Sequence, residues 1–234
     1  MPSQTLIIGG NRGIGLAINE IMSGRGDTVF TASRSRGTGG NHFCVNLPGR
    51  IDVDQNFELN YLVFAHRYRG SDWSEDFDVT IKAVDLIVNQ LKDSFSGDSS
   101  IVILGSNAGH FVLAEQTASY HTSRAALEGL ARYYAVTLGR KGVRCNVVLP
   151  TTIIKQENSH FFTKDNETRK MIERVTPLGR MGTAEDVGNM VGFLCSERAS
   201  FITGQTFFID GGLSIVGQES IARDFSSLMH NHEK

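Results

Sequence analysis

A glycine-rich turn near the N-terminus carries the clearest chemistry in the sequence. Gly9, Gly13 and Gly15 frame the segment GGNRGIG, which follows an apolar run and precedes residues with helical spacing. One glycine permits a tight turn, one lets the backbone approach a pyrophosphate, and one lets the helix pack closely against the strand. Because the free N–H groups at a helix start favour phosphate, this strand–turn–helix context predicts a dinucleotide-binding site.

Two arginines bear on the choice of dinucleotide. Arg12 lies inside the turn, and Arg34 follows the second apolar run, where an NAD-binding fold would place an acidic residue on the ribose 2′-hydroxyl. No Asp or Glu occurs at positions 31 to 36. Because a guanidinium binds a phosphate through two parallel hydrogen bonds, the two arginines favour the 2′-phosphate of NADP(H) and predict NADP(H) as the cofactor rather than NAD.

The elements that must position this turn alternate along the chain. Apolar strands are expected at residues 6–8, 28–32, 61–65, 101–104, 144–149 and 206–209, and helices at about 14–22, 73–95, 119–139 and 184–196. Strands without polar alternation, separated by helices, are typical of a parallel sheet covered on both faces. The sequence therefore predicts an α/β fold, a single doubly wound parallel-sheet Rossmann domain.

Two crossovers look shortened, those after the second and third strands. Residues 35–41 hold three glycines and no helical periodicity, and residues 48–59 can hold little more than one short helix. A crossover between parallel strands usually needs a dozen residues or more. We expect one face to be thinly covered near this edge, either by a surface loop or by a surface shaped to meet a partner or another subunit.

Several segments together resemble the short-chain dehydrogenase/reductase family over nearly the whole chain. Besides the glycine turn, residues 101–109, IVILGSNAG, are similar to the strand that ends at the family's serine. Tyr120 and Arg124 stand where the family has Y-x-x-x-K, and residues 142–150, GVRCNVVLP, look like the following strand. Residues 177–212 are similar to the C-terminal third of the 3-ketoacyl-reductase-like branch.

This resemblance implies an NADP-dependent oxidoreductase, a carbonyl reductase or alcohol dehydrogenase. It implies Ser106, Tyr120 and Arg124 as catalytic residues: Tyr120 would exchange a proton with the substrate oxygen, Ser106 would hydrogen-bond that oxygen, and Arg124 would supply the cation one helical turn along. The expected cofactor-binding residues are Gly9, Asn11, Arg12, Gly13, Ile14, Gly15, Ser33, Arg34, Asn46, Ala65, Tyr120, Arg124, Pro150 and Ile153.

The chain departs from the family pattern at four points around this centre. Arg124 replaces the lysine, so the charge survives but the group cannot give up its proton. Thr80 aligns with the family's asparagine, residues 64–67 read FAHR in place of N-N-A-G, and Thr151 follows Pro150 in place of a glycine. The motif is therefore a degenerate Y-x-x-x-R.

These departures leave two functions open. The first is the oxidoreductase with a relaxed proton relay, and the alternative is a catalytically silent NADP-binding subunit or redox sensor of the same descent. A degenerating pseudoenzyme has no reason to keep Ser106 and Tyr120, so we favour the enzyme.

The substrate is a small molecule whose identity cannot be read from the sequence, although residues 151–175 should form the lid over its binding site. Residues 66–69 are expected to be a solvated basic loop, the alternative being a clamp for a substrate anion.

Composition narrows the remaining classes. A net charge of −2 gives no pull toward nucleic acid or acidic membranes, no apolar stretch is long enough to span a bilayer, and the N-terminal residues show no signal-peptide pattern. We therefore expect a cytoplasmic protein without a nucleic-acid or membrane partner. The cysteines, Cys44, Cys145 and Cys195, are expected to be buried reduced thiols, and their spacing predicts no metal site.

The chain is expected to divide into a catalytic and NADP-binding domain, residues 1–214, and a C-terminal extension, residues 215–234. Within the extension, residues 220–229 could form a short amphipathic helix. Apolar positions in the helices expected at 73–95 and 119–139 exceed what one sheet face needs, and the resembled family builds a four-helix interface from these two helices. We expect a homodimer or homotetramer with closed symmetry.

Overall fold

The computed structural model describes residues 2–35, 41–54 and 56–231. Its main feature is a seven-stranded parallel sheet in the order β3-β2-β1-β4-β5-β6-β9. The strands are β1 Gln4–Ile8, β2 Thr28–Ser33, β3 His42–Cys44, β4 Leu59–Phe64, β5 Phe95–Leu104, β6 Val143–Pro150 and β9 Thr206–Ile209. The predicted fold class is confirmed, and the strand order reverses between β1 and β4, where α/β sheets bind ligands.

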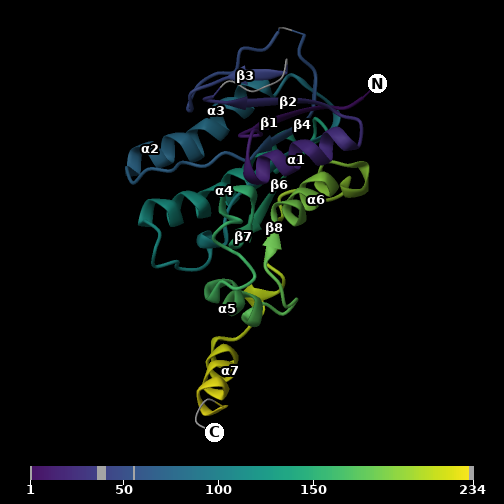
Figure 1. Ribbon diagram of the computed structural model, residues 1–234. Coiled ribbons are helices and arrows are strands. Elements are labelled where there is room, and N and C mark those ends of the chain that lie inside the picture. The colour runs from purple at the N-terminus through teal and green to yellow at the C-terminus, as the bar shows by residue number, and fades with distance from the viewer. Residues whose placement is uncertain (1, 36–40, 55, 232–234) are drawn as a thin grey trace.

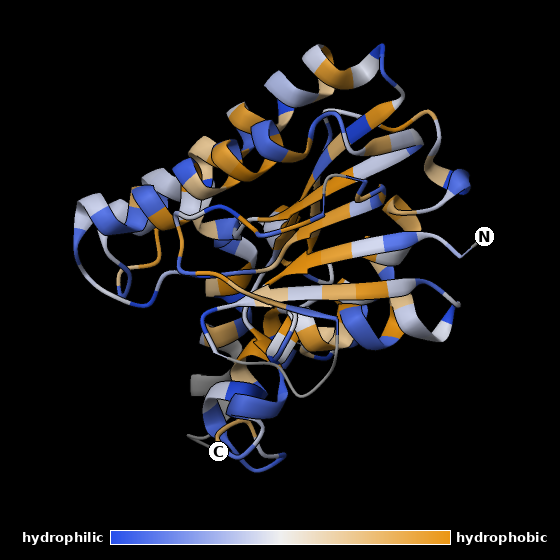
Figure 2. Ribbon diagram, turned by 90° about the horizontal axis from the view of Figure 1, so that it is seen from above, coloured by the Kyte–Doolittle hydropathy of each residue, from blue (hydrophilic) through white to orange (hydrophobic). Residues whose placement is uncertain are grey.

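Helices cover both faces of the sheet (Figure 1). Helices α1, Gly13–Gly24, and α6, Ala184–Leu194, pack on one face, and α3, Ala83–Leu91, and α4, Ala118–Gly139, pack on the other. Each face has its own apolar core, and Figure 2 shows the strands as apolar bands between helices of mixed character. This burial on both sides explains why the strands read as continuous apolar runs.

The helical segment before β5 is interrupted by a π-helical turn. It consists of α2, Trp73–Phe77, a π turn, Asp78–Lys82, and then α3. The predicted helix over 73–95 ran too far, because Phe95 begins β5 and pairs with Leu59. The wider ring of a π turn changes which backbone carbonyls keep helical partners, and such turns are frequent at functional sites.

The sheet edge at β3 is covered by aromatic side chains instead of a helix. Phe30, Phe43 and Phe57 pack on one another with ring centroids 5.2 to 6.2 Å apart. Among residues 41–54 and 56–58 the chain forms no helix, as the shortened crossovers predicted, while residues 36–40 of the glycine-rich segment lie outside the described residues. Cys44, expected to be buried, is exposed because it ends this edge strand.

Cys145 and Cys195 are buried as predicted, in β6 and at the end of α6. Burial raises the pKa of the Cys195 thiol to about 12, and that of Cys145 rises as well, so both stay protonated and unreactive.

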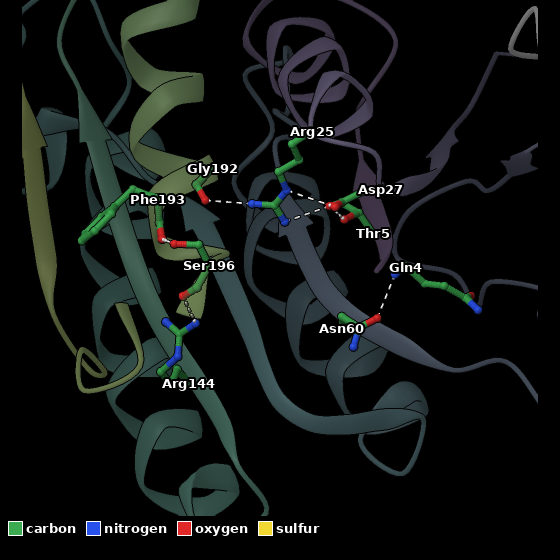
Figure 3. A network of polar contacts seen from close by, with 9 residues as sticks. All are labelled: Gln4, Thr5, Arg25, Asp27, Asn60, Arg144, Gly192, Phe193 and Ser196. Carbon is green, nitrogen blue, oxygen red and sulfur yellow. Dashed lines mark hydrogen bonds and ion pairs between the residues drawn. The ribbon is translucent and has the colours of Figure 1, made fainter. Parts of the chain in front are cut away.

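A polar network at the starts of the strands ties α1 and α6 to the sheet (Figure 3). The Arg25 guanidinium bonds both carboxylate oxygens of Asp27 and donates to the Gly192 carbonyl of α6 at 2.9 Å. Arg144, at the start of β6, donates to the carbonyls of Leu194 at 2.8 Å and Ser196 at 3.3 Å. These two cations satisfy carbonyls near the C-terminal end of α6, which otherwise have no partner in the helix.

Smaller elements, most of them in the second half of the chain, complete the fold. These are β7 Ile153–Ile154, which pairs with β8 Gly182–Thr183, helix α5 Glu167–Val175, helix α7 Gln218–Asn231, and 3-10 turns at Asn107–Gly109, Gln156–Asn158, Glu197–Ala199 and Leu213–Ile215. Helix α7 extends away from the sheet in Figure 1 and contains the predicted amphipathic segment. The division at residue 214 stays a prediction. Within the described part of the chain, no helix is both long and apolar enough to cross a membrane.

Candidate functional site

The glycine turn between β1 and α1 has the close approaches that its sequence predicted. Gly9 adopts φ +89°, and a Cβ there would lie 2.8 Å from the His66 backbone nitrogen. A Cβ on Gly15 would overlap the Gly9 carbonyl oxygen. The first turn of α1 can therefore pack this closely against the end of β1 only because residue 15 is a glycine. Gly13, at φ +55°, faces the Glu157 carboxylate, whose Oε1 would be 3.0 Å from a Cβ. The N-terminus of α1 therefore already meets an anionic group of the chain itself.

The neighbouring strand ends hold several of the predicted cofactor residues. Asn11 donates its side-chain amide to the Ser33 hydroxyl at 2.8 Å, which ties the turn to the end of β2. Ala65 follows β4 and donates its N–H to the Ile8 carbonyl at 2.8 Å. Arg12 and Arg34 are both exposed beside these groups. The strand ends therefore gather at one edge, as parallel strands must.

The remaining predicted positions lie at the ends of other strands. Pro150 is buried at the end of β6, Ile153 is buried in β7, and Ile14 is half-buried in the first turn of α1. Asn46 lies farther out, exposed after the edge strand β3.

Helix α4 presents Tyr120 and Arg124 one turn apart. The Thr117 hydroxyl caps the helix by accepting from the Tyr120 N–H at 3.2 Å, and Tyr120 itself is half-buried. The guanidinium of the buried Arg124 lies 4.8 Å from the centre of the Tyr120 ring, and that of Arg67 lies 5.1 Å from the same ring. The Tyr120 ring is thus held between two cations, each within cation–π distance of its centre.

A buried carboxylate, which the sequence did not single out, balances Arg124. The Nη2 of Arg124 donates to the Thr80 hydroxyl at 3.5 Å, and that hydroxyl donates to the Asp76 carboxylate at 2.9 Å. Ser123 donates to the same Asp76 oxygen at 3.2 Å, and all four residues are buried. Burial lowers the pKa of Arg124, and Tyr120 and Asp76 oppose that shift. Thr80 therefore carries the contact between cation and carboxylate.

Ser106 lies at the end of β5, where it caps the 3-10 turn Asn107–Gly109. Its Oγ accepts from the Ala108 N–H at 3.2 Å and lies 3.4 Å from the Asn107 side-chain oxygen. Asn107 in turn reaches the Thr151 hydroxyl at 3.4 Å. Among the described residues, no hydrogen bond joins Ser106 to Tyr120.

His66 connects the site to the π turn. Its Nε2 lies 2.7 Å from the Val79 carbonyl and donates to it, which leaves the enclosed Nδ1 as an acceptor without a partner. Burial, aided by the charge of Arg124, lowers the pKa of His66 to about 4. His66 is therefore a neutral group beside the cations of the site, and the sequence placed it in a solvated loop.

Two other histidines near the site hold neighbouring segments of the chain together. His110 lies 2.7 Å from a Glu128 carboxylate oxygen, and the His121 ring bridges the Thr117 carbonyl and the Leu113 N–H. These contacts give both histidines a structural role.

Comparison with known proteins places the chain in a family. The family profile described as Enoyl-(Acyl carrier protein) reductase matches residues 63–214, which hold the Ser106, Tyr120 and Arg124 positions. The protein belongs to the short-chain dehydrogenase/reductase family.

Relatives and solved structures add detail. A tropinone reductase homologue of Arabidopsis thaliana is 40% identical over 125 residues, which is 53% of this chain and 47% of that protein. An L-rhamnose 1-dehydrogenase (NAD(P)(+)) of a Sphingomonas species is 34% identical over 119 residues, 51% of this chain and 46% of that one. These matches span about half the length of the relatives. The ligand-free aldohexose dehydrogenase of Thermoplasma acidophilum shares the fold, with a TM-score of 0.78, 24% identity, and coverage of 93% of this chain and 96% of that one.

Proposed function

We propose that the protein is an oxidoreductase that moves a hydride between NADP(H) and the carbonyl or hydroxyl carbon of a small molecule. The observation that supports this most is the position of Tyr120, which lies against the Arg124 guanidinium at the sheet edge that carries the glycine turn. A phenol beside a buried cation suits proton exchange with a substrate oxygen. Neither the fold nor kinship alone specifies this chemistry.

The glycine turn fits a dinucleotide, which supplies the hydride when bound. Glycine at these positions keeps side chains out of the turn, and a phosphate would bind at the N-terminus of α1 in place of the Glu157 carboxylate that now lies over Gly13. Arg12 and Arg34 would hold the 2′-phosphate of NADP(H), because both are exposed beside the Asn11–Ser33 contact and positions 31 to 36 lack an acid. Ile14, Asn46, Ala65, Pro150 and Ile153 would line the rest of the dinucleotide path.

The chain's own groups would handle the proton. In reduction, Tyr120 would give its hydroxyl proton to the substrate oxygen, and the Ser106 hydroxyl would hydrogen-bond that oxygen after turning from its cap position. Arg124 would stabilise the tyrosine oxygen left behind. Because an arginine does not release its proton, Arg124 would act through its charge alone, with Asp76 holding it in place through Thr80.

The test combines a binding titration with an activity screen. NADPH affinity is measured by fluorescence, and NADPH oxidation is followed with a panel of ketones and aldehydes. Tyr120→Phe should lower turnover by at least ~10²-fold while NADPH affinity changes little, because only the transferable proton is lost. Tyr133→Phe, the same change at an exposed tyrosine on α4, is the matched control and should keep activity. If Tyr120→Phe leaves turnover intact, the proposed role of Tyr120 is wrong.

Substitutions at Arg124 separate its charge from its shape. Arg124→Met keeps much of the bulk but removes the charge, so the pH optimum of the oxidative direction should move alkaline. Arg124→Lys retains activity if the pocket accepts a shorter cation, and loses it if Thr80 and Asp76 have been fitted to a guanidinium.

The alternative is a silent NADP-binding subunit or redox sensor. It is favoured by the Ser106 hydroxyl, which caps the 3-10 turn that follows it and, within the described residues, has no hydrogen bond to Tyr120. Normal NADPH binding with no turnover of any panel compound would support this alternative.

We also propose that the protein assembles as a homodimer or homotetramer through α3 and α4. Leu86 on α3 and Tyr133 and Val136 on α4 are exposed apolar side chains, and Val136 is 79% exposed. A second copy would bury them. Light scattering at micromolar concentration that returns the mass of one chain would contradict this.

A further inference from the structure

The rim of the site beside Tyr120 is rich in cations that the chain leaves without close partners. Arg67 and Arg69 lie on the loop after β4, and Lys155 follows β7. Among the described residues, none of these three side chains has a hydrogen bond or ion pair to a carboxylate. Some other cations of the chain do pair with a carboxylate, as Arg25 does with Asp27 and Arg180 with Asp186.

These cations are close enough to repel one another. Burial, opposed by Glu157 and aided by Arg67 and Arg69, lowers the pKa of Lys155, and Lys155 also interacts with Tyr120. Burial lowers the pKa of Arg69 as well, aided by Arg12 and Arg67 and opposed by Glu157. Glu157 is thus the carboxylate that both share. Like charges gathered at a site mouth raise the local potential and attract an anion.

Glu157 shows what kind of group this region accepts. Its carboxylate lies over Gly13 and within electrostatic range of Arg69 and Lys155. It is exposed and belongs to the short 3-10 turn Gln156–Asn158, so a bound anion can replace it without disturbing the core. The chain's own carboxylate therefore stands where an external carboxylate or phosphate would find cations.

We propose that the substrate carries an anionic group, a carboxylate or a phosphate, which Arg67, Arg69 and Lys155 bind beside Tyr120. The inference rests on the proposed function and narrows its substrate class. Because Arg67 faces the Tyr120 ring at 5.1 Å, the anion lies close to the reacting carbonyl, as in a short-chain oxo acid. Guanidinium groups bind carboxylate and phosphate through paired hydrogen bonds, which would also orient the carbonyl toward Tyr120.

The experiment compares oxo acids with their neutral esters. The wild type is assayed with NADPH and 2-, 3-, 4- and 5-oxo acids, each beside its methyl ester and with one phosphate-bearing ketone. We expect at least one acid or phosphate to exceed its neutral analogue about tenfold in kcat/KM, and Arg67→Gln, Arg69→Gln and Lys155→Gln to reduce that ratio toward one. Arg198→Gln, an exposed arginine beyond the far end of α6, is the control and should keep the ratio.

A second measurement separates this inference from the proposed function. Calorimetry follows the binding of inorganic phosphate and of glutarate to the wild type saturated with NADP, and then to the three variants. Failure of NADP to bind overturns the proposed function. Normal NADP binding with anion affinity unchanged in all three variants, or with esters used as well as acids, overturns the anion site alone. Variants that lose NADPH affinity but keep the acid-to-ester ratio show that these cations serve the cofactor phosphates, which also overturns it.

Discussion

His66 should make the stability of the protein depend on pH in a predictable direction. Its pKa falls from the ordinary 6.5 to about 4, first because the ring is buried and second because Arg124 lies near, while the bond to the Val79 carbonyl opposes the shift. Between these values the unfolded chain binds a proton that the folded chain does not. The contribution of His66 is therefore fully present above pH 6.5 and is lost as the pH falls toward 4.

The size of this effect follows from the two pKa values. A pKa that drops from 6.5 to about 4 corresponds to about 3 kcal/mol of stability lost once both states are protonated, and to about 2 kcal/mol at pH 5. The substitution His66→Gln removes the titrating group and keeps an N–H donor near the Val79 carbonyl. We expect the difference in unfolding free energy between pH 7.5 and pH 5 to shrink by about 2 kcal/mol in this variant.

Urea unfolding followed by circular dichroism at the two pH values measures the difference. His160→Gln, at an exposed position in the segment between β7 and α5, reports the general cost of replacing a histidine. If the wild type and His66→Gln lose the same free energy on acidification, the reasoning is refuted. Should His66→Gln not fold, the ring can be titrated by NMR in the wild type, where a midpoint above pH 6 would refute it equally.

Other predictions test the turn, the cofactor and the framework. Wild-type protein should bind NADPH at least about tenfold more tightly than NADH, about 1.4 kcal/mol, and Arg34→Asp should abolish the preference in a fluorescence titration; equal affinities in the wild type would contradict the assignment. Glu157→Gln should tighten NADPH binding about fivefold, about 1 kcal/mol, because the carboxylate over Gly13 no longer competes with the pyrophosphate, and an unchanged Kd would show that the turn is open already. Arg144→Met should cost about 2 kcal/mol of unfolding free energy without affecting NADPH affinity, since the buried guanidinium holds two carbonyls near the end of α6; a stability within about 0.5 kcal/mol of the wild type would argue that water replaces it.

The sequence predicted those parts of the fold that depend on local pattern. Strands buried on both faces must be apolar throughout, so each run from Leu6 to Ile209 identified a strand, and the glycines of the turn followed from its closeness to β1. The π turn that interrupts the helical segment within residues 73–95 left no trace in the pattern of apolar residues. A π turn keeps nearly the same spacing of apolar residues as an α-helix, so only the hydrogen bonds reveal it.

Contacts between distant segments were the part that could not be predicted. Asp76 reads as one acid among several in an exposed helical start, and only the packing of this helical segment against α4 brings Asp76 and Thr80 to Ser123 and Arg124. The aromatic cover of the β3 edge also depends on Phe57 folding back from a segment with no periodicity. The signal that the sequence offered was Arg124 itself. An arginine that becomes buried needs a compensating carboxylate, so an acid such as Asp76 could have been sought near it.

The ion pair between Arg174 and Asp224 links the two helices that are least attached to the sheet. Helix α5 has no buried residue, α7 extends from the body in Figure 1, and the guanidinium nitrogens of Arg174 lie 2.7 and 2.9 Å from the Asp224 carboxylate. Segments with few buried contacts open locally, at a free energy far below that of global unfolding. In hydrogen exchange the backbone amides of α5 and α7 should therefore lose protection together, as one peripheral cooperative unit, while the strands beneath exchange only on global unfolding. A protease that removes α7 would take away the partner of Arg174, so loss of α7 in partial digestion should be followed at once by cuts within α5.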